Sequence, residues 1–541
     1  MNYFYKKRRL CIIGIMSVVY NSFSILFAFF LMNVTDSIID TNIRDFFKYV
    51  IYSMVCVLIQ IILYLFQTKY INNYVAYCMK NLKEDLLKGI CRFSYQYFSK
   101  SPMEAYQSFF LNDLQLFEKQ YYRQIIDTLS SASLLIIAIV GVCFIKPIFL
   151  LIIIFILTVS ALIPFIFKKK ILEANQTYTD NVEIYFTSLS EILQGFSIIK
   201  NYNVSKPFVE NISLKIRLAE YSYADFQTKI MRVNAFMAFI GQILVLISFA
   251  VGGYLAVIGK ITTGSIVALS QLLTYTIEPI SVIIGTITSI NAVDNIKENC
   301  EQILKYTEKS QSNKLLCIPK KISMKNVNFT YDKINKIINN ATITFESPYK
   351  YAIIGKNGMG KSTILQLIAG MIGEYSGDIL IDDVNIKDIS EKEYNSYIAY
   401  LSQSAFVFSM SLEENIKMFR KTYSQEQIRS LINKFALNKV PESKISIETI
   451  SGGEKAKITA IRTLTKQAPI ILMDEPTAAM DERSKEVFDE IISNTEGKLI
   501  IVITHRLDES LKKYDRYVII QNTQMYMTSD FNEAISLVTK E

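Results

Sequence analysis

The segment YAIIGKNGMGKST, residues 351–363, places an apolar run, a glycine-rich loop and a lysine with two hydroxyl residues in series. It satisfies the spacing G-x-x-x-x-G-K-[ST]. Glycines allow backbone N–H groups to wrap around phosphate oxygens, and the N-terminus of a following helix favours negative charge. The segment therefore predicts a strand, a phosphate-binding loop and a helix within an α/β domain. The predicted nucleotide-binding residues of the loop are Gly355, Lys356, Asn357, Gly358, Met359, Gly360, Lys361, Ser362 and Thr363.

Two further apolar runs end in polar residues that suit phosphate chemistry. PIILMDEP, residues 469–476, predicts a buried strand followed by Asp474, a candidate ligand of Mg²⁺, and Glu475, a candidate for polarising the attacking water. IIVITHRL, residues 500–507, ends in His505, the single histidine of the chain, which could sense a γ-phosphate. Each pattern taken alone has another interpretation. The loop of residues 351–363 could be an ordinary glycine-rich turn, the two acidic residues could mark the end of a strand, and His505 could be a structural histidine.

Composition excludes several classes of protein. Of the 541 residues, 50% are hydrophobic and 20% are charged, which excludes a disordered or low-complexity chain. The net charge of +8 is dispersed rather than gathered in a basic stripe, so we expect no nucleic-acid partner. The seven cysteines form no CxxC pair, and we expect reduced thiols without a zinc site.

The N-terminal part contains six apolar stretches long enough to cross a bilayer, because a spanning helix needs about 20 apolar residues. The predicted spans are residues 10–35, 49–68, 128–145, 147–167, 233–259 and 261–293, and the only charged residue inside them is Glu278. We therefore predict a polytopic α-helical membrane domain over residues 1–305, a linker over 306–316 and an α/β nucleotide-binding domain over 317–541.

Basic residues set the expected orientation, because Lys and Arg of short loops are retained on the cytoplasmic side. The predicted outer loops contain only four basic residues, Arg44, Lys48, Lys146 and Lys260. This places the N-terminus and the nucleotide-binding domain in the cytoplasm of a multi-pass plasma-membrane protein. The two inner connections, 69–127 and 168–232, are long and read as helical extensions, with turning points near 98–102 and 197–207.

ISGGE, residues 450–454, resembles the signature motif of the ATP-binding cassette (ABC) family, and the whole chain resembles an exporter half-transporter with six spans and one cassette. The resemblance implies that Tyr331 stacks on adenine and that Gln403, in YLSQSAFVFSMSLEENI (400–416), contacts Mg²⁺ and the attacking water. It further implies an ATP hydrolase with ATP and Mg²⁺ as cofactors. Two such chains, a homodimer or a pair with a homologous half-transporter, would face head to tail. ATP on one chain would then be capped from the other by Ser451, Gly452 and Gly453. Glu454, and Asp481 as the match to the D-loop, are also predicted to be nucleotide-binding residues.

One segment departs from the family pattern: PESKISIETISGGE, residues 441–454, has no glycine before Gly452, which puts coupling through this segment in doubt. The chain begins its first span near residue 10, so we expect no leader peptidase domain before it. Its Lys-, Ile- and Asn-rich usage is similar to low-GC bacterial proteins.

We expect export of a peptide or another amphipathic small molecule from the cytoplasm by alternating access. The alternatives are export of a lipid or drug, import of a siderophore or cofactor by the same fold, and a membrane-anchored regulatory ATPase. Glu278 is a candidate for the substrate cavity, where it would contact a cationic or hydrogen-bonding substrate. Its other interpretation is a residue near cytoplasmic water beside Pro279.

Overall fold

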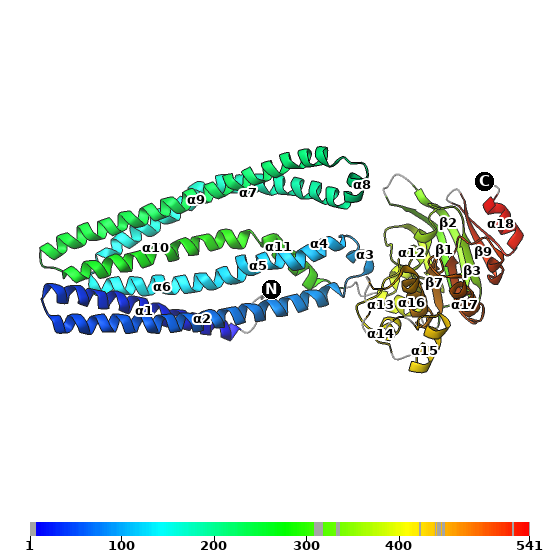
Figure 1. Ribbon diagram of the computed structural model, residues 1–541, viewed down its shortest axis with the longest axis horizontal. Coiled ribbons are helices and arrows are strands. Elements are labelled where there is room, and N and C mark those ends of the chain that lie inside the picture. Colours follow the sequence, from blue (N-terminus) through cyan, green and yellow to red (C-terminus); the bar gives the residue numbers. More distant parts are fainter. Residues whose placement is uncertain are drawn as a thin grey trace. The chain divides into compact units, whose positions relative to one another are not determined.

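The computed structural model describes residues 7–307, 318–331, 336–420, 423–438, 440, 445, 449–521 and 524–539. Most of the predicted linker and residues 441–444 and 446–448 before ISGGE lie outside this part. The chain divides into two compact units (Figure 1), one of Met1–Cys91 and Pro102–Lys305 and one of Arg92–Ser101 and Tyr306–Glu541. The predicted boundary thus differs from the observed division at residues 92–101, which group with the C-terminal unit.

The first unit is entirely helical in its described part. Its principal helices are α1 (Lys7–Ile39), α2 (Ile43–Ile90), α6 (Gln124–Ile145), α7 (Phe149–Gln194), α9 (Ser205–Val257) and α10 (Thr263–Asn291). Between them lie α4 (Met103–Ser108), the π-helix η1 (Phe109–Asp113), α5 (Leu114–Phe117), the π-helix η2 (Glu118–Arg123) and α8 (Phe196–Asn201), and α11 (Asp294–Lys305) ends the unit. Each predicted span lies within one principal helix, apart from two residues at some ends.

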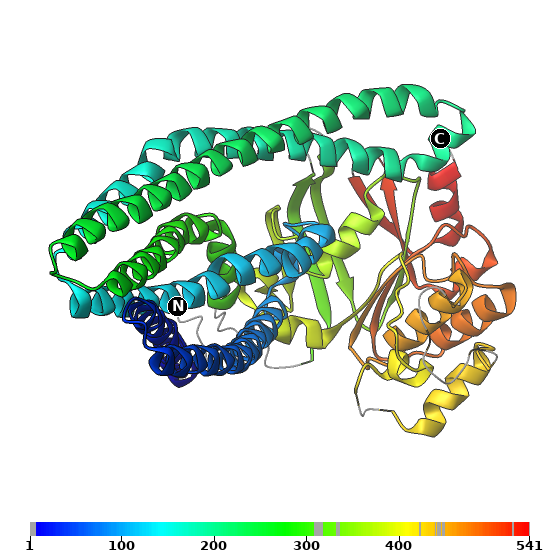
Figure 2. The same cartoon turned by 60° about the vertical axis from the view of Figure 1, so that its left-hand side comes forward.

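By length and composition, five helical stretches of the described residues can cross a membrane: α1, α2, Met103–Ile145, α9 and residues 263–283 of α10. In α7, the side chains of residues 156, 157, 159–165 and 168 are outside the description. At a rise of 1.5 Å per residue, the 53 residues of α9 extend about 80 Å, more than twice the hydrocarbon thickness. The long helices therefore continue beyond the bilayer. α7 and α9 run side by side along their length (Figures 1 and 2).

Small and aliphatic residues hold the helices of this unit together. Ala28 of α1, Ala138 and Val142 of α6 and Leu272 of α10 are fully buried in one cluster. A Cβ added at Gly141 would lie 3.1 Å from the side chain of Ile25, so the glycine permits close approach of α6 to α1.

The second unit contains two sheets. A six-stranded sheet has the order β10-β9-β3-β8-β7-β6, in which only the β10–β9 pair is antiparallel, and a four-stranded antiparallel sheet has the order β2-β1-β4-β5. The strands are β1 (Lys321–Thr330), β2 (Lys336–Glu346), β3 (Lys350–Ile354), β4 (Ser376–Ile381), β5 (Val384–Asn385), β6 (Ile398–Leu401), β7 (Ile470–Asp474), β8 (Leu499–Ile503), β9 (Arg516–Gln521) and β10 (Gln524–Thr528). The helices are α3 (Tyr95–Phe98), α12 (Lys361–Ile368), η3 (Ile386–Asp388), α13 (Glu391–Tyr397), α14 (Leu412–Lys417), α15 (Gln425–Lys434), α16 (Gly452–Leu464), α17 (Glu482–Ser493), η4 (Glu509–Lys513) and α18 (Phe531–Thr539).

The parallel sheet is buried on both faces. Ile501 and Ile503 of β8 lie in the cluster that contains α12, whereas Ile500 and Val502 lie in the cluster that contains α16 and α17. This explains why its strands are continuous apolar runs rather than alternating ones. The predicted fold class, a helical membrane domain with an α/β domain, is confirmed.

Residues 92–101 enter the second unit through polar and aromatic contacts around α3. Ser94 caps α3, and the Tyr95 N–H donates to the carboxylate of Glu391 at 3.2 Å. The Gln96 amide donates to the Gly370 carbonyl at 3.2 Å, and Tyr97 packs on Tyr306 with ring centroids 4.7 Å apart. Residues 98–101 of the first predicted turning point, near 98–102, therefore group with the second unit.

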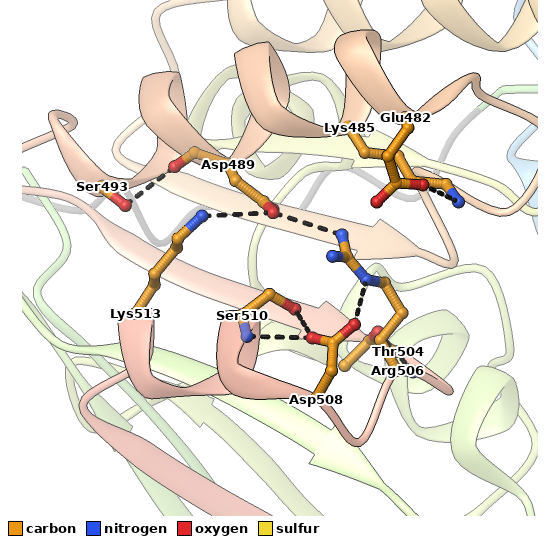
Figure 3. A network of polar contacts seen from close by, with 9 residues as sticks. All are labelled: Glu482, Lys485, Asp489, Ser493, Thr504, Arg506, Asp508, Ser510 and Lys513. Carbon is orange, nitrogen blue, oxygen red and sulfur yellow. Dashed lines mark hydrogen bonds and ion pairs between the residues drawn. The ribbon is translucent and has the colours of Figure 1, made fainter.

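A polar network ties the segment after β8 to α17 (Figure 3). The carboxylate of Asp489, 10% exposed, accepts a hydrogen bond from Arg506 Nη1 at 3.2 Å and lies 3.3 Å from Lys513 Nζ. Arg506 Nε also donates to Asp508 Oδ2 at 3.2 Å. One nearly buried carboxylate thus serves two cations, and each cation comes from the chain that follows β8.

Replacing Asp489 by Ala is expected to lower the free energy of unfolding of the full-length protein by about 1–3 kcal/mol, because it removes the common acceptor of two partly buried cations. The matched control is Glu482→Ala on the same helix, where the carboxylate is 72% exposed and pairs with Lys485 at 3.1 Å. The control should change stability by no more than about 0.5 kcal/mol. Denaturant unfolding measures the free energy of unfolding of both variants. Equal losses in the two variants would contradict the stabilising role given to Asp489.

Candidate functional site

The glycine-rich loop connects β3 to α12 and encloses a lysine. Gly358 and Gly360 both have φ of +81°, a left-handed conformation that favours glycine, and α12 begins directly after Gly360. Lys361 is 6% exposed, and its Nζ donates to the carbonyls of Gly355 at 2.7 Å and Lys356 at 2.8 Å. Burial lowers the pKa of Lys361, and the carboxylates of Glu475 and Asp474 oppose this shift. The loop therefore presents a buried ammonium group within a glycine-rich turn at the start of a helix, an arrangement that suits phosphate.

Asp474 ends β7 with a buried carboxylate. Its side chain is 2% exposed, and among the described residues its Oδ1 atom has no hydrogen-bond partner. Burial raises the pKa of Asp474, while a hydrogen bond from Ser362 opposes the shift. A buried carboxylate oxygen without a partner, next to a hydroxyl group, fits the oxygen ligands that Mg²⁺ prefers.

Parallel pairing of β7 with β8 brings Glu475 and His505 together. Asp474 is in register with Ile503, and the Glu475 N–H donates to the Ile503 carbonyl at 3.1 Å. His505 Nε2 lies 2.8 Å from Glu475 Oε1, at hydrogen-bond distance. Glu475 has a φ of +49°, which is uncommon for a residue with a Cβ and occurs where surrounding structure enforces it. The pair can hold and orient a water molecule.

A cavity of about 460 Å³ collects ten of the predicted site residues. It is lined by Tyr331, Ile337, Asn357, Gly358, Gly360, Lys361, Ser362, Thr363, Gln403, Glu475 and His505. Tyr331 is 65% exposed, and its hydroxyl lies 3.3 Å from Thr363 Oγ1, so its ring is available at the rim. Ile337 was not predicted, because an aliphatic residue in a strand carries no sequence signal for a ligand.

The predicted residues of the ISGGE segment lie outside this cavity, as far as the chain is described. Ser451 caps α16, and its hydroxyl donates to Glu454 Oε2 at 2.8 Å. Gly452 and Gly453 follow in the first turn of α16. A Cβ added at Gly453 would lie 2.9 Å from the Ala479 carbonyl. Within one chain these residues form a separate surface.

Asp481 belongs to the same separate surface. It caps α17 by accepting a hydrogen bond from the Ser484 N–H at 2.9 Å, and it pairs with Lys457 Nζ at 2.5 Å. The hydrogen bond from Lys457 and then that from Ser484 hold the pKa of Asp481 well below its usual range. Lys457 was not predicted, because its contact with Asp481 depends on the packing of α16 against the loop before α17.

Comparison with known proteins follows the same division of the chain. The family model of the ABC transporter transmembrane region matches residues 10–280, and that of the ABC transporter matches residues 338–478. The glutathione/L-cysteine transport system ATP-binding/permease protein CydC of Haemophilus influenzae is 32% identical over 41% of this chain and 40% of its own length. The ATP-dependent lipid A-core flippase of Syntrophus aciditrophicus is 24% identical over 81% of this chain and 75% of its own length.

A third relative is the transport/processing ATP-binding protein ComA of Streptococcus pneumoniae, 25% identical over 65% of this chain and 51% of the relative. The chain thus spans about half or less of the length of CydC and ComA. The structure of a bacterial Atm1-family ABC exporter with ATP bound superposes with a TM-score of 0.83 at 16% identity, covering 98% of this chain and 96% of that one. This likeness shows the exporter fold. A transmembrane region followed by an ATP-binding domain, both matched in one chain, establishes that the protein belongs to the ABC transporter family.

Proposed function

We propose that the protein hydrolyses ATP to drive transport across the membrane by alternating access. The observation that carries the proposal is the single cavity in which the phosphate loop, Lys361, Glu475 and His505 meet, in a chain whose other unit is a bundle of membrane-length helices. Tyr331 would stack on adenine at the rim. The loop N–H groups and Lys361 would bind the phosphates.

Glu475 and His505 would act at the γ-phosphate. Glu475 would orient the attacking water, and His505, at 2.8 Å from that carboxylate, would contact the phosphoryl oxygens and hold Glu475 in place. Ser362, Asp474 and Gln403 would hold Mg²⁺, which when bound supplies positive charge to the β- and γ-phosphates. The orphaned Oδ1 of Asp474 supports this ligand set.

A second chain would complete the site. The cavity of one chain lacks Ser451, Gly452, Gly453, Glu454 and Asp481, which are exposed or partly exposed elsewhere on the described unit. We infer that these residues cap ATP bound to a partner, either a second copy or a homologous half-transporter. ATP would then add charge and hydrogen bonds to both surfaces, so that binding favours the closed pair.

The proposed cargo is a peptide or another amphipathic small molecule that leaves the cytoplasm. Amphipathic cargo fits a pathway lined by the apolar helices of the first unit, and one relative is named the microcin-J25 export ATP-binding/permease protein. Other relatives are named for lipid A-core, iron-sulfur clusters and glutathione/L-cysteine. The proposed location is the plasma membrane, with the N-terminus and the ATP-binding domain in the cytoplasm.

The Glu475→Gln variant is expected to hydrolyse ATP about 10²–10⁴-fold more slowly while it still binds ATP, because the amide no longer polarises water. Steady-state phosphate release and binding of a fluorescent ATP analogue measure the two properties. Glu509→Gln is the matched control, since that side chain is 82% exposed and distant in sequence from the loop. Near-normal turnover by Glu475→Gln would contradict the role given to Glu475.

The Lys361→Ala variant is expected to bind ATP at least about tenfold more weakly, because it removes the buried ammonium group that faces the phosphates. Equilibrium binding of the same fluorescent analogue measures the loss. Lys325→Ala, an exposed lysine of β1, should bind ATP as the unaltered protein does. Equal affinities of the two variants would remove Lys361 from the site.

Transport in vesicles of known orientation is expected to run from the side that carries the ATP-binding domain to the opposite side. Inside-out vesicles should therefore accumulate an amphipathic test peptide when ATP is added outside, and vesicles with Glu475→Gln should not. ATP-dependent loss of preloaded peptide from the same vesicles would support import instead.

A further inference from the structure

Three cations line a second cavity of the C-terminal unit. This cavity has a volume of about 380 Å³, and its lining includes Arg420, Arg462 and Lys466. None of the described residues that line it is Asp or Glu, and it shares no lining residue with the nucleotide cavity. Ile398, the first residue of β6, is part of the lining and is in register with Ile470, the first residue of β7. The second cavity therefore lies toward the amino ends of these strands, whereas the nucleotide site lies at the carboxyl ends.

Hydrogen bonds between separate elements bring the three cations together. Arg420 follows α14, and its Nη2 donates to the carbonyl of Arg462 in α16 at 3.3 Å. Arg462 Nε donates in turn to the Asn415 carbonyl at 2.7 Å. Lys466, just after the end of α16, donates from Nζ to the Asn395 carbonyl at 2.7 Å. The positions of the three side chains at the cavity are thus fixed by contacts with α13, α14 and α16.

The positive charge of this cluster is only partly balanced. Within the described part of the chain, no ion pair forms to Arg420, Arg462 or Lys466. Their acceptors are carbonyl groups near the ends of three helices, and the C-terminus of a helix carries about half a negative charge at most. Three such ends offset about half of the three positive charges. Burial lowers the pKa of Lys466, and repulsion from Arg420 lowers it further.

The cluster also has hydrogen-bond donors that the protein does not use. Arg420 Nε donates to the Lys417 carbonyl at 3.0 Å, but the Nη1 atom of Arg420 is buried and has no hydrogen-bond partner among the residues that the structure describes. A buried charged donor without an acceptor lowers the stability of the folded state. An anion beside these side chains would supply both the missing negative charge and the missing acceptor.

The chemistry of the cavity favours a phosphate group that carries an organic part. Guanidinium groups bind phosphate oxygens in pairs, and a phosphate monoester has about two negative charges near pH 7, which is more than a carboxylate offers. The lining also contains apolar side chains, among them Ala369, Met371, Ala399 and Met418. The volume of about 380 Å³ falls within the range of small-molecule sites and exceeds what a phosphate ion alone would fill.

We propose that this cavity binds a phosphate monoester, with Arg420, Arg462 and Lys466 around the phosphate group and Met371 and Met418 against the apolar part. The site is separate from the nucleotide cavity, and the proposal does not depend on the transport function. A soluble molecule and a lipid headgroup both offer a phosphate monoester, and a binding experiment separates the two sources.

Phenyl phosphate is the probe for this site. Its matched compound is dimethyl phenyl phosphate, which has the same ring and phosphorus centre but no charge. Each is titrated calorimetrically into the full-length protein in phosphatidylcholine nanodiscs. A saturating non-hydrolysable ATP analogue is present throughout, so that the nucleotide cavity is filled and phenyl phosphate cannot bind there.

The unaltered protein should bind phenyl phosphate at least about tenfold more tightly than the uncharged triester. Arg420→Gln and Lys466→Gln should each weaken phenyl phosphate at least about tenfold, with little effect on the triester. The matched controls Arg429→Gln and Lys434→Gln remove the same charges from exposed positions of α15 and should keep the affinity. Thermal unfolding checks that each variant is folded, and Arg420→Lys, which keeps the charge, should bind with intermediate affinity.

The lipid composition of the nanodiscs separates the two sources of the phosphate group. Phosphatidic acid has a phosphate monoester as its headgroup, so the titration is repeated in nanodiscs that contain it. Weaker apparent binding of phenyl phosphate in these nanodiscs would assign the site to the lipid headgroup. Unchanged binding would assign it to a soluble molecule.

Three results would overturn the proposal: no binding of phenyl phosphate while the ATP analogue is bound, equal affinities for phenyl phosphate and the triester, or full affinity in folded Arg420→Gln and Lys466→Gln variants. None of these results would bear on the proposed ATP hydrolysis, because the two cavities share no lining residue.

Discussion

Parallel pairing of three neighbouring strands is the constraint on which the nucleotide site depends. β3, β8 and β7 run in the same direction, with Ile353 opposite Ile503 and Ile503 opposite Asp474. Their carboxyl ends therefore reach one edge of the sheet, where ligands of open α/β sheets bind. The glycine-rich loop, Glu475 and the single histidine, His505, each follow one of these strands, so a shift in register would separate them.

The proposed nucleotide site takes groups from two chains. The cavity of one chain is not lined by the residues of the ISGGE segment. A ligand can shift a conformational equilibrium only by the difference in its affinity for the two states. Residues that a partner chain must supply provide such a difference in affinity, because they can contact the nucleotide only in the state in which the two chains are closed.

Sequence patterns predicted the fold class, a helical membrane domain with an α/β domain, for identifiable physical reasons. Spanning helices need long uncharged runs, and the phosphate loop needs glycines at fixed positions, so both leave a local signal. The distance between Glu475 and His505 depends on strand register, and the pairing of Asp481 with Lys457 depends on the packing of α16. These contacts join residues that are 30 and 24 positions apart in the sequence, and spacing alone does not encode them.

The grouping of residues 92–101 with the C-terminal unit also depends on contacts between residues that are distant in the sequence. A hydropathy boundary near residue 305 separates apolar from mixed sequence, but Tyr306 packs on Tyr97, and Gly370 accepts a hydrogen bond from Gln96. An ATP-binding domain excised at that boundary would lose these partners and expose a tyrosine-lined depression to water. The excised fragment would consequently be more prone to self-association than its composition suggests, and adding the ten-residue segment as a separate peptide would be the natural way to shield that surface.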